Sequence, residues 1–170
     1  PGGVSPAVEQ DPSAITVRGD GFQYRFDTGT GMPTSMLVGD QEMFTAPAEV
    51  NIWRAPTDND RRIRLEWERA RYPYAAVRAH ECSAQTLDGS VVVRARMTLD
   101  AATIQPILRL DASWTIDVAG RLRCQMDVTR TPGFPTLPRL GLRFFLAPEL
   151  DQASWVGLGP GENYPDKRQA

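Results

Sequence analysis

Apolar residues at every second position dominate the body of this chain. In residues 108–118, six apolar side chains alternate with polar ones: Leu108, Leu110, Ala112, Trp114, Ile116 and Val118. The same alternation recurs in residues 22–26, 91–99, 122–128 and 140–146. Because successive side chains of a strand point to opposite faces, this pattern predicts five strands, each with one buried face.

Short turns separate some of these strands. Asp88-Gly89 and Ala119-Gly120 are turn-forming pairs that would join neighbouring strands directly, which predicts antiparallel pairing. An antiparallel sheet with one apolar face needs a second layer to cover that face. The sequence therefore predicts an all-β fold, an antiparallel β-sandwich.

One segment departs from the alternation. Residues 61–71 contain no Gly or Pro and place Ile63, Trp67 and Ala70 at helical spacing, which predicts one short helix with Asp60 as its N-cap. Three arginines, at positions 61, 62 and 64, would then lie at the positive end of the helix dipole. They are either solvated or held by a group outside the helix.

Composition excludes several classes of protein. With 41% hydrophobic and 24% charged residues the chain is an ordinary globular protein, and a charge of -2 with no basic run argues against nucleic acid as a partner. No apolar run reaches membrane-spanning length, and no signal peptide opens the sequence. We expect Cys82 and Cys124 to be reduced, the location to be cytoplasmic, and residues 1–13, rich in Pro, Gly and Ser, to be a linker.

No catalytic constellation stands out. His80, the single histidine, lies in an expected strand without a nucleophile motif around it, so a structural role is favoured. Asp58, Asn59 and Asp60 could offer oxygen ligands to a cation, but the EF-hand spacing is absent, and turn and capping roles account for them. We therefore expect no metal site and no cofactor in this chain. Glycoside hydrolysis would need a pair of carboxylates, and the sequence nominates none.

Two stretches are unusually dense in chemically distinctive residues. The first is "NIWRAPTDND", residues 51–60, with Trp53 and Arg54 ahead of the acidic triplet. The second is "WVGLGPGENYPDKR", residues 155–168, in which glycines and prolines predict a tight loop. That loop carries Glu162, Asn163, Tyr164 and Asp166, which either satisfy the backbone of the loop or face a ligand.

Together, "NIWRAPTDND" and "GLGPGENYPD" resemble the C-terminal region of bacterial β-galactosidases of glycoside hydrolase family 2. The resemblance covers residues from about 14 to 170. It implies that residues 14–170 are the N-terminal part of a β-supersandwich similar to galactose mutarotases, incomplete in this chain. The partners would be the remaining domains of the parent enzyme, which acts on a galactoside.

The resemblance also implies that the catalytic glutamates belong to a barrel domain, as does any divalent cation that the parent uses. The nine residues named above, from Trp53 to Asp166, are then expected at the rim of the active site or at an interface. In some relatives a mobile loop follows the Asp-Asn-Asp triplet. Here Arg61 follows Asp60 directly and the loop is short, which argues against that role.

Two other functions fit the residues less well. A carbohydrate-binding module would use Trp53, Trp67, Trp155 and Tyr164 as aromatic platforms. A mutarotase-like enzyme would need His80 opposite a glutamate such as Glu162. Finally, apolar strand faces left open would favour a homodimer, with contacts expected near Trp155 or residues 91–99.

Overall fold

The computed structural model describes residues 4–101, 105–154 and 156. Within these residues the chain forms eleven strands, one α-helix and two short 3-10 turns. The first half holds β1 (Ala7–Gln10), β2 (Ala14–Gly19), β3 (Phe22–Asp27), β4 (Pro33–Val38), β5 (Gln41–Glu42), β6 (Phe44–Asn51), η1 (Asp58–Asp60), α1 (Ile63–Arg69) and η2 (Tyr72–Tyr74). The second half holds β7 (Ala76–Leu87), β8 (Ser90–Asp100), β9 (Leu108–Ile116), β10 (Leu122–Arg130) and β11 (Gly141–Leu146).

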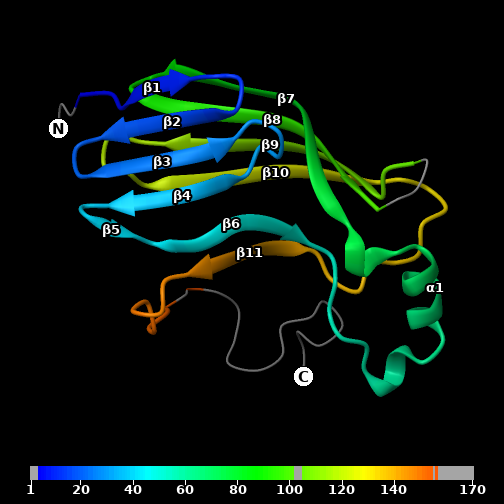
Figure 1. The fold of residues 1–170 in the computed structure, drawn as a ribbon. Helices are drawn as coiled ribbons and strands as arrows, with labels where there is room; N and C mark the ends of the chain where they lie inside the picture. Colours follow the sequence, from blue (N-terminus) through cyan, green and yellow to red (C-terminus); the bar gives the residue numbers. More distant parts are fainter. Residues whose placement is uncertain (1–3, 102–104, 155, 157–170) are drawn as a thin grey trace.

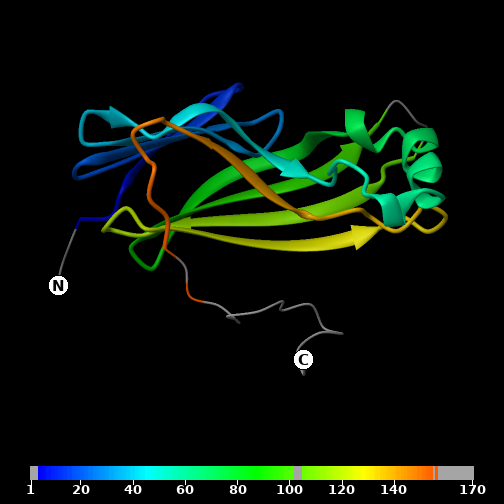
Figure 2. The same ribbon diagram turned by 90° about the horizontal axis from the view of Figure 1, so that it is seen from below.

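The strands form two packed layers. One layer is the sheet β1-β2-β3-β4-β5, and the other is the sheet β10-β9-β8-β7, with every pair antiparallel (Figure 1). A third, two-stranded sheet pairs β6 with β11, and β6 lies beside β4, so that it prolongs the first layer. The view from below shows the two layers separately (Figure 2). This arrangement confirms the antiparallel β-sandwich.

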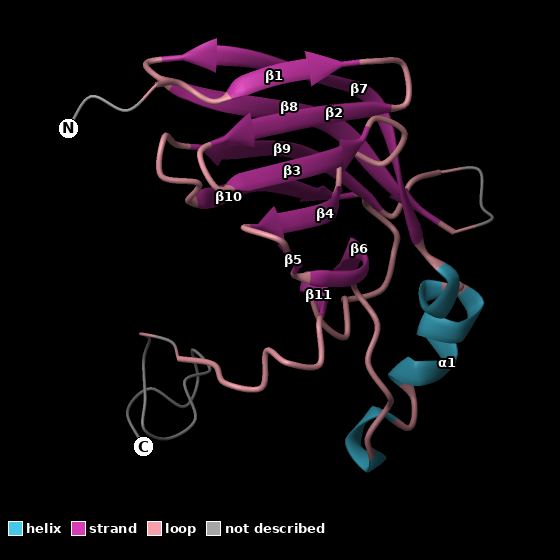
Figure 3. Cartoon of the chain, turned by 60° about the vertical axis from the view of Figure 1, so that its left-hand side comes forward, coloured by secondary structure: helices cyan, strands magenta, loops and turns pink. Residues whose placement is uncertain are grey.

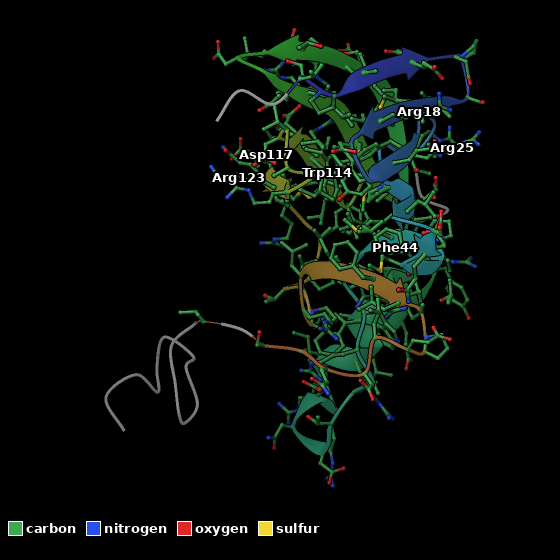
Figure 4. The ribbon with its side chains drawn as sticks, turned by 90° about the vertical axis from the view of Figure 1, so that its left-hand side faces the viewer. Arg18, Arg25, Phe44, Trp114, Asp117 and Arg123 are labelled. Carbon is green, nitrogen blue, oxygen red and sulfur yellow. The ribbon has the colours of Figure 1, made fainter. Side chains whose placement is uncertain are left out.

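The core lies between the two layers. Phe26 of β3 packs against Trp114 of β9, with ring centroids 5.9 Å apart, and both side chains are almost fully buried. Figure 4 shows Trp114 between the layers, whereas Arg18 and Arg25 lie on the outer side of the first sheet. The alternation along each strand thus sorts apolar side chains inward and charged ones outward.

The five alternating segments are all strands: β3, β8, β9, β10 and β11. Both predicted turns are also confirmed, because Asp88-Gly89 joins β7 to β8 and Ala119-Gly120 joins β9 to β10. The predicted faces fail on β11, where Phe144 and Leu146 are 42% and 49% exposed, and at two strand ends. Val118 and Leu140 lie just outside their strands and are 39% and 49% exposed.

The predicted helix is present but shorter. It runs from Ile63 to Arg69 at one end of the sandwich (Figure 3), with Trp67 buried and Ile63 and Ala70 packed against the core. Asp60 is not its N-cap, because Arg62 occupies that position and Asp60 ends the preceding turn η1. The arginines at positions 61, 62 and 64 are exposed.

Part of the expected linker is structured. Residues 7–10 form β1, which pairs with β2 from Ala7↔Arg18 to Gln10↔Ile15. Val8 packs against the core and Arg18 forms an ion pair with Glu9, so a Pro- and Gly-rich composition did not prevent pairing. The linker prediction does not hold for these four residues.

Both cysteines are free, as expected, and half-buried. They lie on the two outer strands of the same sheet, Cys82 on β7 and Cys124 on β10. Three strand spacings separate β7 from β10, roughly 14 Å, which is too far for a disulfide. No helix in the described part of the chain is long and apolar enough to cross a membrane.

Candidate functional site

The stretch at residues 51–60 begins as a turn out of β6. The side chain of Asn51 accepts a hydrogen bond from the Trp53 backbone N–H (3.1 Å) and donates one to the Trp53 carbonyl (3.0 Å). Ile52 between them is buried. Asn51 thus fixes the direction in which the chain leaves the strand, because a short amide side chain can satisfy backbone groups two residues on.

Arg54 and Asp60 form a bidentate ion pair at the centre of the stretch. The two guanidinium nitrogens Nη1 and Nη2 donate to the two carboxylate oxygens at 2.6 and 3.2 Å. The Asp60 carboxylate also accepts from the backbone N–H of Thr57 at 2.7 Å and from its hydroxyl at 3.0 Å. Arg54 and the Thr57 N–H hold the pKa of Asp60 well below its usual range.

These contacts explain why Asp60 does not cap α1. A carboxylate at that position could accept from the N–H groups of the following helix, but Arg54 offers two charged donors in a planar fork, which bind more strongly. Asp60 therefore points back into its own turn and away from α1. It is one of only two polar or charged residues that are buried in the described part of the chain.

The side chains around this ion pair hold a distant segment, residues 134–138, which leads from β10 to β11. Arg54 Nε donates to the Pro138 carbonyl (3.1 Å) and Trp67 Nε1 to the Thr136 carbonyl (2.7 Å). The Tyr72 hydroxyl donates to the Pro135 carbonyl (2.7 Å), and Arg130 donates to the carbonyls of Phe134 and Pro135. We call this set of four donors, Arg54, Trp67, Tyr72 and Arg130, the carbonyl clamp.

Ring contacts make the clamp compact. The Arg54 guanidinium lies 5.5 Å from the centre of the Trp67 ring, and Trp53 meets Trp67 edge-on at 6.3 Å. Burial raises the pKa of Tyr72 to about 12, so its hydroxyl stays protonated and remains a donor at neutral pH. The clamp is therefore a structural device in which each of the four side chains donates to at least one backbone carbonyl.

The other predicted site residues divide into two groups. Asp58 and Asn59 are exposed, and among the described residues their side chains make no hydrogen bond. Glu162, Asn163, Tyr164 and Asp166 lie outside the described residues, as does Trp155. The structure thus brings Arg54 and Asp60 together and leaves Asp58 and Asn59 apart from them.

A cavity of about 470 Å³ adjoins the stretch. It lies along β6 and the start of β7, and of the predicted site residues only Trp53 lines it. Its polar lining includes Asn51, already bonded to Trp53, and Glu49, which pairs with Arg143 of β11 at 3.5 Å. The cavity has the size of a small-molecule site. The two charged residues that line it, Glu49 and Arg143, pair with each other.

The described residues offer little catalytic chemistry. His80 Nε2 lies 3.0 Å from the Thr98 hydroxyl, which donates to Asp100, so the ring contacts the neighbouring strand β8. Four described carboxyls have a clearly shifted pKa, and all four are lowered: Asp11, Glu42, Asp60 and Asp117. No group of three or more His, Cys, Asp or Glu in the described ranges could hold a metal ion.

Sequence reasoning did not single out Thr57, Tyr72 or Arg130. One signal was available for Thr57, because Thr57 and Asp60 have the T-x-x-D spacing of a capping box. No local signal marks Tyr72 or Arg130, whose hydrogen bonds depend on how the 134–138 segment folds back.

The ion pair predicts a pH dependence of stability. Asp60 has a lower pKa in the folded chain than in the unfolded chain. The ion pair therefore contributes its full share to the free energy of unfolding at pH values above the unfolded pKa of about 3.9. The contribution is lost as the pH falls from there through the folded pKa. We expect Asp60→Asn to lower stability at pH 7 and to differ progressively less from the wild type below about pH 4, measured by urea unfolding at several pH values.

Asp58→Asn is the matched control, because Asp58 is exposed in the same turn. It should unfold like the wild type at every pH. An Asp60→Asn variant as stable as the wild type at pH 7 would contradict the proposed role of the ion pair.

The family model described as "Beta galactosidase small chain" matches residues 18–170. A β-galactosidase of Actinobacillus pleuropneumoniae is 34% identical over 160 residues, and one of Lactobacillus delbrueckii subsp. bulgaricus is 32% identical over 169. These alignments cover 94% and 98% of this chain but only 16% of each relative, so the chain spans about one sixth of their length.

Proposed function

The chain belongs to the β-galactosidase small-chain family, and from this we propose that it is a non-catalytic part of a β-galactosidase, an enzyme that releases terminal β-D-galactose from β-galactosides. The family match over residues 18–170 is the observation that carries the proposal. The role of the chain would be to support or to rim the active site of the longer enzyme. Its partners would be the remaining parts of that enzyme, which meet the galactoside.

The contacts of the carbonyl clamp favour a structural role for this chain over a catalytic one. Arg54 binds Asp60 and the Pro138 carbonyl, and Asp60 also accepts from the Thr57 N–H. These contacts link the end of β6 to the segment before β11. A residue that performs chemistry would instead present a donor or acceptor to a substrate. The conspicuous part of "NIWRAPTDND" therefore supports the fold, and Trp53, Asp58 and Asn59 remain as candidates for the rim.

The carboxyls also favour a non-catalytic part. A glycosidase acid needs a carboxyl with a raised pKa, so that it is protonated near neutral pH. Hydrogen bonds lower the pKa of Asp11, and Arg54 and Thr57 lower that of Asp60. In Glu42 burial acts upward as the largest single effect, but hydrogen bonds from Ser35 and three backbone N–H groups outweigh it. These groups stay ionised and cannot serve as the acid.

A carbohydrate-binding module remains the second candidate, favoured by the cavity beside Trp53. Trp67 does not serve it, because that ring is 98% buried in the clamp. Titrating galactose or lactose against the chain, with tryptophan fluorescence as the signal, separates the two candidates. A saturable change lost in Trp53→Ala would favour the module.

The proposal includes a cytoplasmic location for the enzyme. A cytoplasmic enzyme is supported by two free, half-buried thiols on a chain without a disulfide among its described residues. A homodimer of the isolated chain stays a prediction. Its contact is not the strand at residues 91–99, because β8 lies inside its sheet with its apolar side chains buried.

The proposal is tested by hydrolysis of a chromogenic β-galactoside. We expect the chain alone to give no turnover and the longer polypeptide that contains it to be active. Asp58→Asn in the longer polypeptide should change KM or kcat if the rim role holds, with its melting temperature unchanged. Turnover by the chain alone that a substitution within the chain abolishes, or a longer polypeptide that is inactive on every β-galactoside, would overturn the proposal.

A further inference from the structure

The turn η1 combines one buried side chain with two exposed ones. Asp60 is only 8% exposed, whereas Asp58 and Asn59 are exposed and their side chains make no hydrogen bond among the described residues. The turn is three residues long and lies with α1 at one end of the sandwich (Figure 3). So short a 3-10 turn has little stability of its own, because it contains few backbone hydrogen bonds. Side-chain contacts therefore decide how Asp58 and Asn59 are oriented.

Asp60 is the fixed point of the turn. Its carboxylate accepts four hydrogen bonds, two from the Arg54 guanidinium and two from the backbone N–H and the hydroxyl of Thr57. The Asp60 N–H in turn donates to the Thr57 carbonyl at 3.0 Å. Asn59 adjoins Asp60 and Asp58 is one residue further away, so a rotation of the Asp60 side chain would rotate the whole turn.

Arg54 connects this fixed point to the rest of the fold. Its Nε donates to the Pro138 carbonyl at 3.1 Å, its Nη1 donates to the Ala55 carbonyl at 3.2 Å, and its guanidinium lies 5.5 Å from the centre of the Trp67 ring. A planar guanidinium can make all these contacts at once, whereas the ammonium group of a lysine is a compact point charge that cannot. The orientation of η1 is thus set relative to the segment before β11 and to α1.

We propose that Arg54 and Asp60 are positioning residues whose ion pair sets the orientation in which Asp58 and Asn59 meet the galactoside of the longer enzyme. This inference rests on the proposed function, because it requires the rim role of Asp58 and Asn59. It goes beyond that function by giving the ion pair an effect on substrate binding in addition to its effect on stability.

The two exposed side chains suit a ligand rich in hydroxyl groups. The Asp58 carboxylate accepts hydrogen bonds, whereas the Asn59 amide both donates and accepts them, so the two can bind neighbouring hydroxyl groups of a sugar in a defined direction. Such hydrogen bonds weaken steeply as their angle departs from linearity. A small rotation of η1 would therefore weaken binding even with both side chains present. Because rim contacts stabilise the bound substrate and the transition state alike, their loss raises KM and leaves kcat nearly unchanged.

Steady-state kinetics of the longer enzyme with a chromogenic β-galactoside tests the inference. Arg54→Lys keeps the charge but cannot form two parallel hydrogen bonds to Asp60, so we expect KM to rise at least about threefold while kcat changes less than about twofold. Asp60→Asn, which nearly preserves the shape of the side chain, should raise KM in the same direction.

Arg130→Lys is the matched control. Arg130 also donates to carbonyls of the 134–138 segment but makes no printed contact with η1. We expect this variant to have a lower melting temperature and the KM of the wild type. A purely structural role of Arg54 would give Arg54→Lys the same behaviour, with KM unchanged, and would overturn the inference.

A multiple substitution shows whether Arg54 acts through the turn. In a background with Asp58→Ala and Asn59→Ala the contacts that Arg54 orients are already lost, so Arg54→Lys should change KM by less than about 1.5-fold. An equal rise in KM with and without the two rim side chains would overturn the inference and leave the rim role intact. If removal of Asp58 and Asn59 changed neither KM nor kcat, the rim role itself would fail, so the two failures are distinguishable.

Discussion

Trp67→Ala is expected to lower the free energy of unfolding by about 3–5 kcal/mol, the usual cost of removing a buried tryptophan. The ring is 98% buried, packs edge-on against Trp53 and lies under the Arg54 guanidinium. Removing it leaves a cavity at the centre of the carbonyl clamp and deprives Thr136 of its donor. Urea unfolding followed by circular dichroism measures the loss.

Two variants separate the causes of that loss. Trp67→Phe keeps most of the apolar surface and removes only the donor to Thr136, so it should cost about 1 kcal/mol beyond a small repacking effect. Leu65→Ala, on the exposed side of the same helix, should stay within about 0.5 kcal/mol of the wild type. If Trp67→Ala were as mild as Leu65→Ala, the clamp would contribute nothing to stability.

Gly31→Ala is the second substitution with a large expected effect. Gly31 lies in the turn between β3 and β4 with φ of +68°, and its carbonyl accepts a hydrogen bond from Trp114 Nε1 at 3.2 Å. A Cβ added there would lie 2.4 Å from the Cβ of Ala95 and 3.0 Å from the sulfur of Met97. Strain from the left-handed backbone, about 1–2 kcal/mol, thus adds to overpacking of about 1–3 kcal/mol.

Gly21→Ala is the control for the backbone strain alone. Gly21 has a similar φ of +74°, and an added Cβ would meet nothing within 4 Å. We expect it to cost about 1–2 kcal/mol, and Gly31→Ala to cost at least about 1 kcal/mol more, in the same unfolding measurement. Equal costs would mean that the two layers can separate at Gly31 without penalty.

The sequence predicts the strands well where one face is buried. The residues of β9 alternate strictly because the strand lies inside a sheet, between a core and a polar surface, and β8 beside it follows the same pattern except at Val92 and Thr98, which are also buried. β11 also alternates, yet register shifts on either side of Phe145 and the absence of a strand opposite leave its apolar residues exposed among the described residues. Alternation therefore predicts a strand, but not whether the expected face is covered.

The candidate site is less predictable, for a physical reason. The residues of "NIWRAPTDND" are recognisable as unusual, but the role of Arg54 depends on the Pro138 carbonyl, 84 residues away. Its neighbour Trp67 likewise binds the carbonyl of Thr136, 69 residues away. Local propensity assigns Asp60 to a helix N-cap, whereas Arg54 draws its carboxylate into the turn. Local rules fail here because a charged partner competes with them.

The order of strand pairing has a consequence for how the chain folds. In both large sheets every pair joins strands adjacent in sequence, β1 to β5 in one and β7 to β10 in the other, so each sheet can form by local hairpin closure. The β6–β11 pair is different, because Asn51↔Gly141 joins residues 90 positions apart. During synthesis the first meander can form before β7 has emerged, whereas β6 must wait for β11 with one edge unpaired. The slowest step in folding is therefore expected at β6, and the folding rate should respond most to substitutions that alter the β6–β11 pairing.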